Sequence, residues 1–183
     1  GGEISNSIFY GFSNKAHYGY VGNSYIGEWV NLGAGTTTSN LKNTYGRISV
    51  KTPKESKDTG LQFLGTIMGD HSKTSIGSLL PTGCIVSYGC NLMGSTIHPK
   101  FVAPFSWGQS EDYEEFKLPK FIEIAQKMMI RRKRDLLEPH QDLIQFLFKH
   151  KNEDGLEYGL LTPVFDNVMV PATTQKKDVD AST

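Results

Sequence analysis

A six-residue repeat constrains the fold of this chain more than any other feature. Between residues 68 and 92 every sixth position is apolar, apart from one threonine: Met68, Thr74, Leu80, Val86 and Leu92. A small residue follows four places after each of them: Ser72, Ser78, Cys84, Cys90 and Thr96. A helix repeats every 3.6 residues and a strand every two, so neither explains this period. The pattern is typical of a three-sided β-solenoid, with the bulky residue inside and the small one at a corner.

The same register occurs nearer the start of the chain. Tyr20, Ile26 and Leu32 are six apart, with Ser24, Val30 and Thr36 four places on, and Ile4, Tyr10 and Ala16 extend the column weakly. Glycine is abundant, with 19 residues, which suits repeated tight turns. One coil cannot bury its apolar face alone, so the coils must stack. We therefore expect a mainly β fold, a left-handed parallel β-helix of hexapeptide repeats, over residues 1–107.

Residues 41–65 interrupt the repeat. The polar, turn-rich run 51–60 predicts a loop that projects from the prism, and loops of this length are usually functional or disordered. In this architecture such a loop can reach a neighbouring subunit. Pro99 and Pro104 predict the end of the repeats near residues 97–107.

Two helices are predicted after the repeats, one beginning near Pro119 and one near Pro139. Their expected apolar faces are Phe121, Ile124, Ala125 and Met128 in the first, and Leu143, Phe146 and Leu147 in the second. We expect a helical extension over 108–150 that caps the open end of the solenoid. The remaining tail, 151–183, is expected to be partly disordered, with 160–170 able to dock and 173–183 disordered.

Composition narrows the function class. Lys and Arg together number 19, as do Asp and Glu, so the chain lacks the positive excess of a nucleic-acid-binding protein. Two cysteines, six apart on the repeat, are expected to be reduced core residues. No apolar run is long enough to cross a membrane and no signal peptide is seen, so we expect a cytoplasmic location. The chain begins at Gly1 without Met, which suggests a fragment of a longer protein.

Residues 14–40 carry the most informative motif, Asn-Lys-Ala-His-Tyr-Gly-Tyr-Val-Gly-Asn-Ser-Tyr-Ile-Gly-Glu-Trp-Val-Asn-Leu-Gly-Ala-Gly-Thr-Thr-Thr-Ser-Asn. This segment resembles the C-terminal acetyltransferase domain of bifunctional enzymes that make UDP-N-acetylglucosamine. Those enzymes carry glucosamine-1-phosphate N-acetyltransferase and N-acetylglucosamine-1-phosphate uridylyltransferase on one chain. The resemblance is dense over 14–40, continues as hexapeptide pattern to about residue 94, and does not extend to the helices. The layout is similar to a divergent bacterial branch of the family.

The resemblance implies roles for several residues. His17 stands at the place of the catalytic histidine, and Asn40 at that of an asparagine near the reacting amine. Tyr20 matches a tyrosine that helps to hold the sugar phosphate, and Asn31 an asparagine that contacts the sugar. Ala34 matches a residue whose backbone N–H contacts the acetyl group. Lys42 and Arg47, in the loop beyond, are candidates to meet the phosphates of the cofactor.

These residue types fit acetyl transfer. A sugar amine is mostly protonated near neutral pH, and histidine is suited to remove its proton. The oxyanion of the tetrahedral intermediate needs preorganised N–H donors, which a Gly-Ala-Gly turn offers. The same residues also have purely structural interpretations: Tyr20 as core filler, Asn31 and Asn40 as turn caps, and residues 33–35 as a solenoid corner.

One position departs from the family pattern. Its well-studied members have a lysine that grips the sugar phosphate about a dozen residues before the histidine, where this chain has Ser5 or Asn6. This departure favours another acceptor, or phosphate contacts from another subunit.

Two further features have ordinary explanations. Asp70 and His71 are adjacent on a strand, where side chains point to opposite faces, so they are not expected to act together. The basic run 131–134 follows the first predicted helix and suits a solvated helix end, with the phosphates of coenzyme A or nucleic acid as alternative ligands.

The expected function is therefore acetyl-CoA-dependent N-acetylation of an amino-sugar 1-phosphate, with glucosamine-1-phosphate as the leading acceptor. The resemblance implies a homotrimer with active sites between prisms, and a sugar phosphate as the small-molecule partner. Acetyl transfer needs no metal, and Mg²⁺ belongs to a nucleotidyltransferase domain outside this chain. The alternatives are a non-catalytic trimerisation module of a sugar nucleotidyltransferase, and an acyltransferase for another amino sugar.

Overall fold

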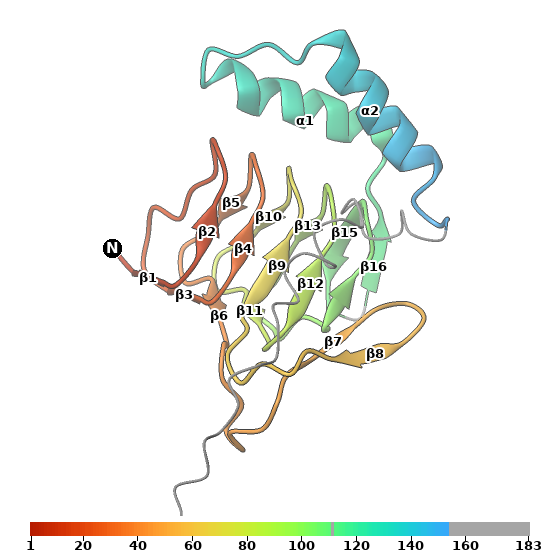
Figure 1. Cartoon of the computed structure of the whole chain (residues 1–183). Helices are drawn as coiled ribbons and strands as arrows, with labels where there is room; N and C mark the ends of the chain where they lie inside the picture. The colour runs from red at the N-terminus through yellow and green to blue at the C-terminus, as the bar shows by residue number, and fades with distance from the viewer. Residues whose placement is uncertain (111, 154–183) are drawn as a thin grey trace, which may run out of the picture.

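The computed structural model describes residues 1–110 and 112–153, and Figure 1 shows them as a stack of short parallel strands with two helices along one side. The predictions for residues 160–170 and 173–183 lie outside the described residues. Within the described part, no helix is long and apolar enough to span a membrane.

The stacked strands form three faces. The first face consists of β2 (Ile8–Phe9), β4 (Tyr25–Ile26), β9 (Thr66–Met68), β12 (Cys84–Val86) and β14 (Phe101–Val102). The second face consists of β5 (Asn31–Leu32), β10 (Lys73–Thr74), β13 (Asn91–Leu92), β15 (Ser106–Gln109) and β16 (Asp112–Glu115). The third face consists of β1 (Glu3–Ser5) and β3 (Tyr20–Gly22), followed by β6 (Thr37–Thr38) and β11 (Leu79–Leu80). All neighbours pair in parallel except β15 and β16, which are antiparallel. The predicted parallel β-solenoid is confirmed.

The hexapeptide register sets the core. Thr66 lies opposite Cys84 in the neighbouring coil, an offset of three hexapeptides, so each hexapeptide supplies one face. All five residues of the predicted column from Met68 to Leu92 are buried. The small residues four places on are buried as well, except Thr96, which is exposed where the repeat ends.

The register predicted for the first coils is correct at Ile26 and Leu32, which are buried, but is one residue out at Tyr20 and Tyr10. Val21, not Tyr20, is fully buried, and Phe9, not Tyr10, packs against the core. The cause is the offset between the first two coils: Glu3 lies opposite Tyr20 and Ile8 opposite Tyr25, one residue short of three hexapeptides. The inward residues Val21 and Ile26 are therefore five positions apart, and a column counted back in sixes from Ile26 lands on Tyr20, one position from the true interior.

Residues 41–65 project from the prism as predicted, but they contain a β-hairpin, β7 (Ser49–Lys51) and β8 (Ser56–Asp58) (Figure 1). Val50 of this hairpin packs on Ile67 and Ile85 of the first face. The Lys100 ammonium donates to the Ser49 carbonyl at 3.0 Å. The insertion is thus anchored on the solenoid by apolar contact.

Both predicted helices are present, as α1 (Leu118–Ile130) and α2 (Glu138–Lys149), each with a proline in its first turn. They do not cap the end of the solenoid. α1 lies along the corner between the first and second faces and crosses the ends of successive coils (Figure 1). The corner carries large aromatic side chains, whose burial requires a cover, whereas at the last coil Tyr113 of β16 already packs against the core. The predicted face of α2 is also partly wrong, because Ile144 and Leu147 are buried while Phe146 is half exposed.

Candidate functional site

The third face brings together two of the predicted site residues, Tyr20 and Asn40. The Asn40 side-chain amide donates to the Tyr20 hydroxyl at 2.9 Å and to the Asn23 side-chain oxygen at 2.7 Å. The tyrosine ring lies so close over Gly22 that a Cβ there would stand 2.0 Å from the hydroxyl oxygen. Since β3 and β6 are neighbours, residues twenty apart in sequence share one polar cluster on the outer surface.

His17 and Ala34 lie at the corner where the second face turns into the third, in successive coils. The two turns are joined by the Gly35 N–H, which donates to the Tyr18 carbonyl at 2.8 Å. Lys15 stabilises the turn that contains His17, because the Lys15 ammonium donates to the carbonyls of His17 at 2.9 Å and Tyr18 at 2.8 Å. The His17 side chain is exposed. Within the described part of the chain the Ala34 N–H has no hydrogen-bond acceptor, so it is a free donor at this corner.

Asn31 lies apart from these residues, on the second face. Its side-chain oxygen accepts a 2.7 Å hydrogen bond from the Asn14 amide in the preceding coil. Both residues line a pocket of about 330 Å³ beneath α1, together with Lys73. A single chain therefore does not bring Asn31 to the Tyr20–Asn40 cluster.

Lys42 borders a groove of about 710 Å³ on the third face, which also involves Thr37, Leu79 and Ile97. The Lys42 ammonium donates to the Arg47 carbonyl, which ties together the two loop residues considered for phosphate contact. Leu79 and Ile97 are exposed apolar residues, and they give the groove a largely hydrophobic floor.

Asp70 and His71 lie in the turn between β9 and β10, not on a strand as expected, and they have separate surroundings. The Asp70 carboxylate accepts the Glu28 N–H at 2.8 Å. His71 is buried among Trp29, Tyr88 and Phe121 at the corner covered by α1. Burial, with a smaller contribution from nearby Lys73, lowers the pKa of His71 to about 3, so it is uncharged at neutral pH. It serves packing rather than proton transfer. In residues 1–110 and 112–153, no three His, Cys, Asp or Glu side chains gather as a metal site would require.

The sequence analysis missed Asn14 and Lys73 as pocket residues. One signal in the sequence could have identified Lys73. On the second face, the residue before each inward residue points outward, and Asn31 and Lys73 both hold this position, before Leu32 and Thr74. What the sequence did not indicate is that α1 lies opposite them.

Comparison with known proteins supports the resemblance noted in the sequence. No protein-family model matches the chain. A "bifunctional sugar-1-phosphate nucleotidylyltransferase/acetyltransferase" of Sulfurisphaera tokodaii is 32% identical over 97 residues, which is 52% of this chain and 24% of the relative. A "bifunctional protein GlmU" of Methanocaldococcus jannaschii is 35% identical over 88 residues, 48% of this chain and 21% of the relative. A "bifunctional protein GlmU" of Picosynechococcus sp. is 30% identical over 96 residues, which is 52% of this chain and 18% of the relative.

The matched segments thus make up about half of this chain and a quarter or less of each of these relatives. Together with the parallel β-solenoid, they confirm the resemblance to bifunctional nucleotidyltransferase/acetyltransferase proteins and support a transferase family.

Proposed function

We propose that this chain transfers an acetyl group from acetyl-CoA to the amino group of an amino-sugar 1-phosphate, with glucosamine-1-phosphate as the acceptor. The observation that carries the proposal is the corner between the second and third faces. There an exposed histidine, His17, and an unpartnered backbone donor, the Ala34 N–H, lie in successive coils beside the Tyr20–Asn40 cluster. The similarity to a bifunctional nucleotidylyltransferase/acetyltransferase, which covers 52% of the chain, also supports the proposal.

The proposed mechanism follows from these groups. The sugar ammonium first loses one proton to solvent, and His17 accepts a second proton from the nitrogen as the neutral amine attacks the thioester carbon of acetyl-CoA. The carbonyl oxygen becomes an oxyanion, which the Ala34 N–H stabilises. The C–S bond then breaks, and the departing thiolate takes the proton from His17. Tyr20, held by Asn40, contacts the sugar phosphate through its hydroxyl, and none of these steps uses a metal.

We place coenzyme A in the groove on the third face. Leu79 and Ile97 supply an apolar surface for its pantetheine arm, and Lys42 supplies a cation for its phosphates. The open corner would be closed by a neighbouring chain in a homotrimer. Asn31 faces another side of the same chain, so it has no part in this single-chain site.

The test is release of free thiol from acetyl-CoA in the presence of glucosamine-1-phosphate. We expect release that requires the sugar, and a loss of about 10²- to 10⁴-fold in His17→Ala, the usual contribution of a general base. His140→Ala is the matched control, since it removes an exposed histidine on α2, and it should leave the rate unchanged. Asn40→Ala should weaken sugar binding because it frees the Tyr20 hydroxyl.

A second candidate function rests on Ser5 and Asn6, which stand where the family has its phosphate-gripping lysine. Without that lysine, the solenoid would serve as a non-catalytic trimerisation module of a sugar nucleotidyltransferase. Trimeric protein that releases no thiol with any amino sugar would reject acetyl transfer and favour this module. Release with a different amino sugar alone would keep the mechanism and reject glucosamine-1-phosphate.

A further inference from the structure

A second pocket lies outside the site described above, between the second face and α1. Its volume is about 330 Å³, near the lower end of the range for small-molecule sites, which is about 300–1,000 Å³. The solenoid contributes Asn14, Asn31 and Lys73, and α1 and the turn after it contribute Ile124, Lys127, Met128, Arg131 and Arg132. We propose that this basic pocket binds the phosphate group of a small phosphorylated molecule. The proposal does not depend on acetyl transfer.

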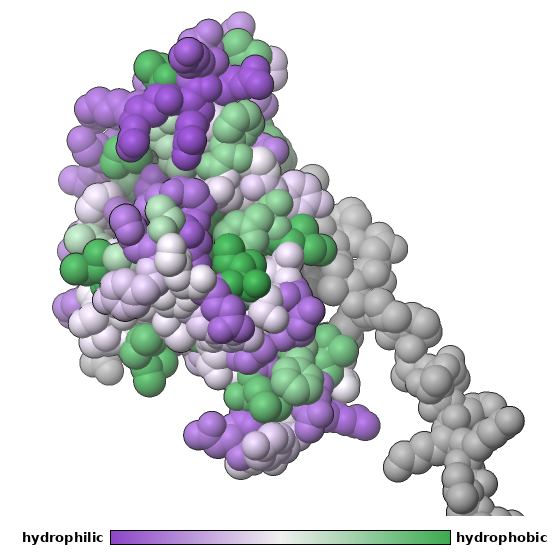
Figure 2. All heavy atoms as spheres, turned by 90° about the vertical axis from the view of Figure 1, so that its left-hand side faces the viewer, coloured by the Kyte–Doolittle hydropathy of each residue, from purple (hydrophilic) through white to green (hydrophobic). Residues whose placement is uncertain are grey.

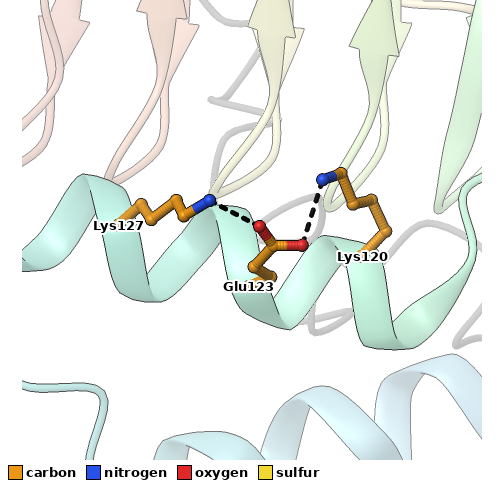
Figure 3. A network of polar contacts seen from close by, with 3 residues as sticks. All are labelled: Lys120, Glu123 and Lys127. Carbon is orange, nitrogen blue, oxygen red and sulfur yellow. Dashed lines mark hydrogen bonds and ion pairs between the residues drawn. The ribbon is translucent and has the colours of Figure 1, made fainter.

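The charge of the basic pocket is strongly one-sided. Four of the residues around it are cationic and none is acidic. The Glu123 carboxylate forms ion pairs with two lysines, as Figure 3 shows. Its oxygens lie 2.5 Å from the Lys127 ammonium, which it neutralises, and 3.0 Å from the Lys120 ammonium. The hydrogen bonds from Lys127 and Lys120 lower the pKa of Glu123 to about 2, so the carboxylate stays charged. Lys73, Arg131 and Arg132 have no carboxylate partner among the described residues.

Lys73 forms the floor of the basic pocket. Its ammonium donates to the His71 carbonyl at 2.8 Å, which uses one of its three N–H groups. Burial lowers the pKa of Lys73 to about 8, because the charged form is separated from much of its hydration. A partly buried cation without a counter-ion is costly, and a bound anion would relieve that cost.

Two amides add neutral donors next to these cations. Asn14 gives one N–H to the side-chain oxygen of Asn31, and this bond fixes the orientation of both amides. The Asn31 side-chain NH₂ has no acceptor among the described residues, so its two N–H groups are free. A phosphate carries several acceptor oxygens and is well matched by guanidinium, ammonium and amide donors on one side.

The geometry favours a small ligand over a nucleic acid. The cations converge on one pocket rather than spreading along a face, and the whole chain has balanced charges. The basic run 131–134 is also divided in its contacts. Arg131 and Arg132 border the basic pocket, whereas the Arg134 guanidinium lies over the Phe12 ring at 5.5 Å and Lys133 is exposed. Only Lys133 of the run therefore has the surroundings of a solvated helix end among the described residues.

The test is isothermal titration of the whole chain with pyrophosphate. The double variant Arg131→Gln/Arg132→Gln removes two cations from the basic pocket at exposed positions that the fold does not need. The matched control, Lys117→Gln/Lys133→Gln, removes two exposed cations elsewhere on α1 and its flanks. We expect the dissociation constant to rise at least tenfold in the pocket variant and less than twofold in the control, with unchanged circular dichroism in both.

Competition identifies the source of the phosphate. Displacement of pyrophosphate by glucose 1-phosphate assigns the pocket to sugar phosphates, and displacement by adenosine 3′,5′-bisphosphate assigns it to nucleotides or coenzyme A. Equal weakening in the two double variants would mean general surface attraction and would overturn the proposal. So would an absence of pyrophosphate binding by the unmodified chain. Because binding is measured directly, failure of acetyl transfer leaves this result interpretable.

Discussion

Four large side chains stand at corner positions where the backbone is left-handed, a conformation that normally favours glycine. Phe12, Trp29, His71 and Phe105 have φ between 54° and 60°, and Gly89 takes the matching position in the coil between His71 and Phe105. Each such residue costs of order 1 kcal/mol or more in backbone strain. The cost is offset by stacking, since the Phe12 and Trp29 rings lie 4.1 Å apart and nearly parallel, and by the cover that α1 provides.

His71 gives this corner a pH-dependent stability. Its pKa falls from 6.5 in the unfolded chain to about 3 in the fold, so between these values only the unfolded state binds the proton. Stability is therefore present above about pH 6.5 and falls by about 1.4 kcal/mol per pH unit below it. His71→Phe, which introduces the residue found at this corner in two other coils, should reduce this slope in urea unfolding at several pH values. His17→Gln, at an exposed site on another corner, should keep the slope, and an unchanged slope in His71→Phe would refute this account.

Both cysteines should be unreactive in the native protein. Cys84 and Cys90 are fully buried in the core and unpaired, and burial raises the pKa of each thiol to about 12. At about pH 8 neither forms a thiolate, and neither is accessible. We expect no reaction with the thiol reagent DTNB until denaturant is added, and then two equivalents per chain. Reaction of either thiol before unfolding would show that the core opens.

At the level of elements, α1 depends on one aromatic contact. Phe121 is buried and packs edge-on against Phe105 and Phe116, with Tyr88 tilted beside it. Phe121→Ala should cost about 3–5 kcal/mol, the usual range for a buried phenylalanine. Phe146→Ala on α2 is the control, because that ring is half exposed, and it should cost much less. Denaturant titration followed by circular dichroism measures both, and equal costs would argue against this anchoring.

The elements that the sequence predicted well are those with strict periods. The column from Met68 to Leu92 was placed correctly because its coils hold three full hexapeptides. Tyr20 was misplaced because the inward residue Val21 precedes Ile26 by five positions and not by six, and no local pattern indicates this. The cover over the corner was not predicted because left-handed backbone at Trp29 and His71 has no signature in these residue types. The position of α1 followed from that corner and was missed with it.

The whole molecule leaves apolar side chains exposed. Ile76, Leu79 and Ile97 are exposed on or beside the third face, and Ile4 and Ile8 are exposed at the N-terminal end. Figure 2 looks onto that end and shows hydrophobic groups on the coils, beneath a strongly hydrophilic surface around the helices. Such apolar surface is typical of contacts with other chains.

If the chain forms the proposed homotrimer, light scattering should give three times the mass of one chain. Ile97→Lys should shift the assembly toward monomer, because it places a charge on the third face where the side chain is 64% exposed. Ile130→Lys on α1 is equally exposed, at 63%, and should leave the trimer intact. A monomeric unmodified chain would reject the assembly that the proposed active site needs.

The resemblance assigned roles to residues one by one, but only the whole molecule shows which of them meet. Tyr20 and Asn40 share the third face, and His17 and Ala34 lie at its edge. Asn31 stands on another face, although it is only eleven positions from Tyr20. In a three-sided coil, a separation of one hexapeptide turns a side chain to a different side, so nearness in sequence does not predict a shared site.

The length of α1 matches the number of coils that the helix covers. Its 13 residues span about 20 Å, and the five corner rows from Phe12 to Phe105 span about 19 Å at about 4.8 Å per coil. Phe121 holds one end of this helix to the last rows, and Arg134, just beyond its other end, reaches the first. Repeat proteins commonly change length by duplicating or losing a unit. Here one added coil would require about three more helical residues at the same time. A duplication of one coil alone would leave its corner uncovered by α1, which disfavours a change in the number of coils.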